Sequence, residues 1–104
     1  MAAIDPRDKL RFGEDSTSLI LSHASATAKR LGVELVVEGD YLRIGGFEAR
    51  RRGNRLEAGG IAAEIDDDQW EAFVTLALSH FVNTQKPPDA EALRQLLFAI
   101  GATT

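Results

Sequence analysis

Arginine is concentrated in residues 43–55 of this chain, and Tyr41 stands just before that segment. Arginine side chains form paired hydrogen bonds with phosphates and carboxylates, and an aromatic ring can stack on a nucleic-acid base. The chemistry that these residue types could do is therefore the binding of single-stranded nucleic acid or of an acidic partner. The candidate residues for such a face are Arg43, Arg50, Arg52, Arg55 and Tyr41.

The alternation of residue types decides which of these side chains share a face. Successive side chains of a β-strand point to opposite faces, and Val33–Ile65 alternates apolar and polar residues between short glycine turns. The four candidate arginines fall on the polar face together with five glutamates, which are Glu34, Glu38, Glu48, Glu57 and Glu64. This balance of charges favours a solvated face with cross-strand ion pairs over a positive platform. Arg51 falls in the inward phase, which predicts a fraying strand end or a change of register.

Other residues that could carry catalysis or bind a metal are sparse. The chain has two histidines, His23 and His80, and no cysteine, so a thiolate zinc site is excluded. The histidine spacing does not indicate a metal site, which would need both to converge with a carboxylate. The acidic run Asp66–Asp68 matches the preferences of a helix start. Because no nucleotide-binding loop, nucleophile elbow or metalloprotease helix is present, we predict no catalytic, cofactor-binding or metal-binding residues and no enzyme activity.

The elements that position these residues follow from hydrophobic periodicity. Val33–Ile65 predicts an antiparallel meander of four or five strands, with Gly45-Gly46 either a turn or a bulge. The first helix is expected to start near Ser16 and to end before Gly32, the second to start at an Asp66 cap and to end before Pro87, and the third to run from about Asp89 to Ile100. Pro88 is expected in the first turn of the third helix. The predicted fold class is α+β in the order α, four or five β, α, α. The three helices should cover the apolar face of the sheet.

The length of 104 residues predicts one domain. We expect residues 1–14 to form a loose arm, residues 15–101 the domain, and residues 102–104 a tail. No apolar run approaches the roughly 20 residues that cross a bilayer, and the N-terminus lacks a signal-peptide pattern. These observations predict a cytoplasmic protein without membrane contact. The net charge of −4 favours solubility and argues against generic nucleic-acid binding.

The second predicted helix carries an apolar stripe wider than a single contact requires. Leu78 and Val82 widen this stripe, which predicts packing against the sheet and also against the third helix or another subunit. Leu76 and Phe98 lie off the stripes of their helices, as Leu19 does in the first helix. The candidate surface for a homodimer or another partner is Leu76, Leu78, Val82 and Phe98. The alternative is that these are scattered surface residues.

The run from Gly59-Gly60-Ile61 to Asp68-Gln69-Trp70-Glu71 resembles a junction in small transcriptional coactivators that bind single-stranded DNA. In that family the last strand of a four-stranded sheet leads through an acidic cap and a Gln-Trp pair into one long helix. The resemblance is limited to this junction, and no binding residue is carried over from it.

The preferred hypothesis from the sequence is a small non-enzymatic protein-interaction module that forms a homodimer and needs no cofactor. An adaptor, a chaperone-like protein or an inhibitor would have such a sequence. The alternative hypothesis is a single-stranded DNA- or RNA-binding protein that uses the arginine-rich face. A third hypothesis, a hydrolytic or metal enzyme, would rest on His23 or His80 without an identified partner residue.

Overall fold

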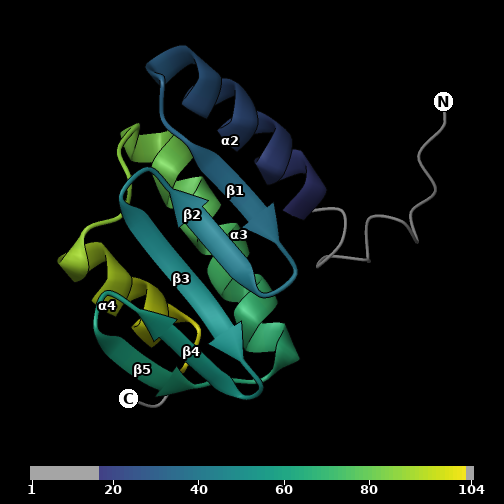
Figure 1. The fold of residues 1–104 in the computed structure, drawn as a ribbon, viewed down its shortest axis with the longest axis vertical. Coiled ribbons are helices and arrows are strands. Elements are labelled where there is room, and N and C mark those ends of the chain that lie inside the picture. The colour runs from purple at the N-terminus through teal and green to yellow at the C-terminus, as the bar shows by residue number, and fades with distance from the viewer. Residues whose placement is uncertain (1–16, 103–104) are drawn as a thin grey trace, which may run out of the picture.

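The computed structural model of the chain describes residues 17–102. Its elements are α2 (Thr17–Leu31), β1 (Leu35–Glu38), β2 (Tyr41–Ile44), β3 (Phe47–Arg52), β4 (Arg55–Ala58), β5 (Ile61–Glu64), α3 (Asp67–Thr84) and α4 (Ala90–Ala99). The five strands pair with their sequence neighbours in the order β1-β2-β3-β4-β5, and all pairs are antiparallel (Figure 1). The predicted α+β fold with an antiparallel meander is therefore confirmed, with five strands.

Two-residue turns join the strands. Ile44 pairs directly with Phe47, so Gly45-Gly46 is a turn and not a bulge within one strand. The pair Ala58 and Ile61 closes the turn at Gly59-Gly60 in the same way. Such short turns fix the register, and the register decides which side chains face the core.

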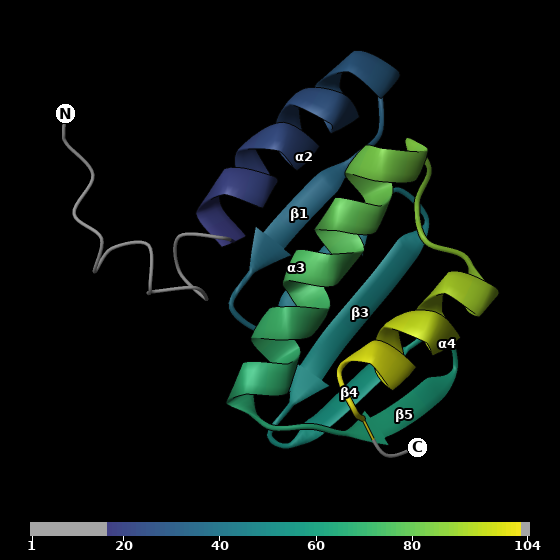
Figure 2. The ribbon, with the colours of Figure 1, turned by 180° about the vertical axis from the view of Figure 1, so that it is seen from behind.

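The helices form one layer on one face of the sheet (Figure 2). α3 crosses the middle of the sheet, α2 packs along α3 and β1, and α4 lies over β4 and β5. Most strand residues that face this layer are buried, as the alternation predicts, and Leu35, Val37 and Ile61 in the two edge strands are half-buried against the core. The largest fully buried side chains are Phe73, Phe81, Leu42, Ile44, Leu56, Leu78 and Leu93.

Capping interactions define the ends of α3 and the start of α4. The Asp66 carboxylate accepts a hydrogen bond from the Gln69 backbone N–H, and the Gln69 side-chain oxygen accepts one from the Asp66 N–H, both at 2.8 Å. This is the predicted capping box, and it accounts for the acidic run. Asp89 is the N-cap of α4. Pro88 therefore precedes the cap and does not occupy the first helical turn, which corrects the prediction.

The predicted arm at residues 1–14 and the expected helix start at Ser16 lie outside the described residues, as do residues 103–104. Ala102 is half-buried against the core, and its N–H donates to the Leu97 carbonyl at 3.0 Å. This residue, which we expected in a tail, therefore packs with the domain. In residues 17–102, no helix is long and apolar enough to cross a membrane.

Candidate functional site

The outer face of the sheet, away from the helices, carries the candidate arginines and glutamates in cross-strand alternation. The register places Arg43 opposite Glu48, Arg50 opposite Glu57, and Arg55 opposite Glu64, whereas Arg52 lies opposite Arg55 at the turn between β3 and β4. Opposite charges on directly facing residues attract one another across the strands. The structure thus brings the predicted residues together on one face, with each cation beside an anion.

Among the described residues, two ion pairs lie on this outer face. Arg43 lies 3.5 Å from Glu34, and Arg52 lies 3.5 Å from Glu57. The Arg43 Nε–H also donates to the Gly45 carbonyl at 3.1 Å. Exposed pairs of this kind contribute little to stability, about 0–1 kcal/mol each. Their relevance here is electrostatic, because they leave no uniform positive field over the sheet.

Tyr41, the candidate base-stacking residue, is engaged by its neighbours. Its hydroxyl donates to the Glu48 carboxylate, and the Arg50 guanidinium lies over its ring at 5.9 Å from the centroid. The hydrogen bond to Glu48, followed by desolvation and the negative charge of Glu48, raises the pKa of Tyr41 above the ordinary 10.0. A nucleic-acid base would have to displace Arg50 to stack on this face of the ring.

The Tyr41 contact can be checked by titration, because the chain has one tyrosine. Ultraviolet absorbance of the phenolate should report a pKa above 10.0 in the folded protein. Glu48→Gln keeps an acceptor oxygen but removes the charge, so the Tyr41 pKa should fall toward its ordinary value. Glu57→Gln, on the same face, serves as the control and should leave it unchanged. An ordinary tyrosine pKa in the wild-type protein would show that the contact with Glu48 is absent in solution.

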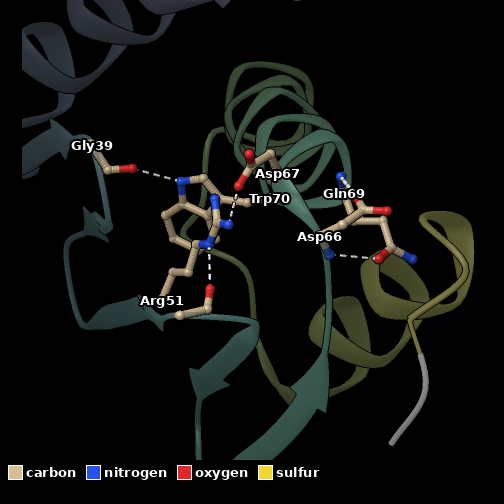
Figure 3. Close-up of polar contacts among 7 residues, drawn as sticks. Gly39, Arg51, Asp66, Asp67, Gln69 and Trp70 are labelled. Carbon is tan, nitrogen blue, oxygen red and sulfur yellow. Dashed lines mark hydrogen bonds and ion pairs between the residues drawn. The ribbon is translucent and has the colours of Figure 1, made fainter.

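Arg51 joins the end of β3 to the start of α3. It remains paired with Leu56 in the strand ladder, and its side chain is only 16% exposed. Its guanidinium binds the Asp67 carboxylate and donates from Nε to the Gly53 carbonyl at 2.7 Å (Figure 3). The prediction of a fraying strand end or a register change was therefore wrong. An inward-facing arginine can be held at the border of the core when a helix presents a carboxylate to it.

Beside this contact, the Trp70 indole N–H donates to the Gly39 carbonyl at 2.7 Å (Figure 3). The bond fixes the turn between β1 and β2 against the first turn of α3. The sequence pattern does not indicate this link. A tryptophan near a helix start was the one sequence feature that pointed to this hydrogen bond. The sequence around Gly39 contains no pattern that identifies its carbonyl as the acceptor.

The helix layer exposes part of the predicted partner surface. Phe98 is 87% exposed and Leu76 is 37% exposed, whereas Leu78 is completely buried and Val82 is half-buried against the core. Leu78 does not belong to a surface, because α2 packs along α3 and closes the wide stripe. The additional contact expected for that stripe is thus made with α2 of the same chain.

Leu76 lies on the side of α3 that faces α4. The Gln69 side-chain amide donates to the carbonyls of Ile100 and Gly101 at 3.1 and 3.2 Å, which identifies this side. Leu76 follows Gln69 by about two helical turns and therefore points in a similar direction. Phe98 lies on the side of α4 opposite its buried residues. We define the partner surface as Leu76 and Phe98 on these neighbouring helices.

A cavity of about 600 Å³ opens where two strand turns meet the segment between α3 and α4. Its lining residues are Gly46, Phe47, Glu48, Gly59, Pro87, Pro88, Asp89, Ala90 and Leu93. The two carboxylates in this lining are already engaged, since Glu48 accepts from Tyr41 and Asp89 accepts from the Ala92 N–H. Apart from these two engaged carboxylates, the cavity is lined by glycines and apolar residues.

The remaining candidates do not form a site together. His23 is exposed on α2 and His80 is partly exposed on α3, and neither is among the described residues that line the cavity. Within residues 17–102, no three histidine or carboxylate side chains are grouped so as to hold a metal ion. Comparison of the chain with known proteins finds no matching family model, no matching curated protein and no matching solved structure.

Proposed function

We propose that this protein is a small non-enzymatic interaction module that binds another protein through the partner surface, Leu76 and Phe98. The observation that carries the proposal is the 87% exposure of Phe98 on a regular, capped helix. Exposed aromatic residues contribute strongly to protein interfaces. Burying Phe98 against a partner would remove from water a ring that residues 17–102 leave exposed. An adaptor, a chaperone-like protein or an inhibitor would use such a surface.

The electrostatics of the outer sheet face support a protein partner over a nucleic acid. Arg43, Arg50 and Arg55 each lie opposite a glutamate, and Arg52, which lies opposite Arg55, forms an ion pair with Glu57. The Arg50 guanidinium lies over one face of the Tyr41 ring. Nucleic-acid affinity depends on many cations that release counterions from phosphates. The single-stranded nucleic-acid alternative keeps one observation in its favour, the four arginines on one face. We place the module in the cytoplasm and expect it to self-associate.

The proposal is tested by affinity capture from an extract of the native host, with and without nuclease. Wild-type protein should retain a protein partner after nuclease treatment, because phosphate contacts play no part in binding. Phe98→Ser should lose most of that partner, since hot-spot residues carry a large share of binding energy. Gln95→Ser, at an exposed position of the same helix, is the matched control and should retain it.

Two outcomes would contradict the proposed function. Capture that disappears after nuclease treatment would assign the binding to nucleic acid. Equal capture by the Phe98→Ser variant and the wild type would show that the partner surface does not make the contact. Thermal unfolding of both variants should match the wild type, because neither side chain supports the core.

A further inference from the structure

The two edges of the sheet differ in what covers them. α2 packs along β1, the first edge strand. At the other edge, no helix or strand of the described residues lies beyond β5 (Figures 1 and 2). An uncovered edge strand presents backbone N–H and C=O groups that can pair with another strand. The edge formed by β5 is therefore available for such pairing.

The ladder between β4 and β5 identifies these groups. The Ile65 N–H donates to the Asn54 carbonyl at 2.9 Å, which makes this a hydrogen-bonded pair. Hydrogen-bonded and non-bonded pairs alternate along an antiparallel ladder. Ala62 and Glu64 oppose Glu57 and Arg55 in the non-bonded pairs. Their backbone N–H and C=O groups consequently point away from β4, toward the open edge.

We propose that β5 pairs antiparallel with β5 of a second copy, about a two-fold axis at Ala63. The backbone N–H and C=O groups of Ala62 and Glu64 can hydrogen-bond with the same groups of the second copy in three symmetric registers, centred on Ala62, Ala63 or Glu64. Centring the axis on Glu64 would set two like charges directly opposite. Centring it on Ala62 would extend the pairing to Gly60, which has φ +81° and leaves the extended conformation. Only the register centred on Ala63 avoids both problems.

Pairing about Ala63 gives compatible side chains on both faces. On the helix-covered face of the sheet, Ile61 of one copy would lie opposite Ile65 of the second copy. Ile61 is half-buried in the single chain. On the outer face, the small side chain of Ala62 meets Glu64 of the second copy. Each Glu64 also keeps Arg55 of its own chain as its other neighbour. The pairing thus covers apolar surface without opposing like charges.

This arrangement goes beyond the proposed function. It joins two five-stranded sheets edge to edge and places both helix layers on the same side of the combined sheet. A dimer would then present two copies of the partner surface in one direction. The paired strands are short, with four residues in β5, so the association is weak and depends on protein concentration.

The test is sedimentation equilibrium of the wild type and two variants from about 20 μM to about 1 mM, a range over which mass action shifts a weak dimer. Ala62→Glu sets a carboxylate against Glu64 of the second copy at two symmetric contacts and should weaken association by about 2- to 30-fold. Ala62→Lys places a cation there and should preserve or strengthen association at low salt. Wild-type protein that stays monomeric throughout, or equal association of the two variants, would overturn the proposal.

Amide hydrogen exchange at low and high concentration provides the second readout. The amides of Ala62 and Glu64 should be protected only at the higher concentration, because only the dimer pairs them. A dimer in which both amides exchange as in the monomer would overturn the proposal. If the amides of Leu35 and Val37 are protected instead and assemblies larger than a dimer form, the contact involves β1. That result would also overturn the proposal. Failure of Phe98→Ser in the capture experiment would leave these results unaffected, so the two proposals fail separately.

Discussion

Replacing Phe73 with alanine is expected to lower the free energy of unfolding by about 3–5 kcal/mol. Phe73 is completely buried on α3, between the sheet and the rest of the helix layer. Its ring stacks on Trp70 at 5.9 Å and lies tilted against Phe47 at 6.4 Å between centroids. Removing the ring leaves a cavity and forfeits both aromatic contacts. Since a small domain is stabilised by only about 5–15 kcal/mol, this loss is a large part of the total.

Chemical denaturation of the wild type and the Phe73→Ala variant measures the effect. Phe98→Ala is the matched control, because it deletes the same atoms from a position that is 87% exposed. Its expected change is within about 0.5 kcal/mol. Similar losses in the two variants would mean that α4 packs differently from the structure described above, and would also remove the argument for the partner surface.

Replacing Gly45 with alanine is expected to cost about 2–4 kcal/mol, the second-largest effect on stability. Gly45 has φ +60°, which an L-residue with a side chain rarely adopts. An added Cβ would lie 3.1 Å from Pro87 Cγ and 3.3 Å from Val33 Cγ1. The proline ring and the β-branched valine have little freedom to move away. Backbone strain and crowding therefore act together at this turn.

Gly53→Ala separates these two contributions. Gly53 has φ +61°, nearly the same as Gly45, but an added Cβ there would meet nothing within 4 Å. Its substitution should cost about 1 kcal/mol from backbone strain alone. Denaturation curves of both variants give the comparison. Equal losses would show that the segment around Pro87 does not press on the turn between β2 and β3.

The sheet could be predicted from the sequence because the alternation of apolar and polar residues within a strand shows which of its faces is buried. The alternation from Val33 to Ile65 predicted an antiparallel meander of short strands and the assignment of Arg50 and Glu57 to one face. The helix starts were equally local, since the Asp66 and Asp89 side chains act on backbone groups a few residues away. These signals depend on the chain's periodicity and capping chemistry, and tertiary packing leaves them unchanged.

The positions that depend on contacts between distant elements could not be predicted in the same way. Leu78 was expected at a surface, but the packing of α2 against α3 buries it. Arg51 was expected at a frayed end, but Asp67 reaches it from another element. The Trp70 bond to Gly39 joins a helix to a turn. In each case the local pattern gives the direction of a side chain but not the element that meets it.

The arginines of the outer sheet face are paired with glutamates, so the proposed function predicts that this face does not attract nucleic acid. The most direct test is fluorescence anisotropy of a labelled mixed-sequence oligonucleotide titrated with the protein at about 50 mM salt, where phosphate contacts are strongest. We expect no binding by the wild-type protein. Binding that weakens steeply with added salt, and that is lost when Arg50 and Arg55 are replaced by glutamine, would rule out the proposed protein-interaction module in favour of a nucleic-acid-binding protein.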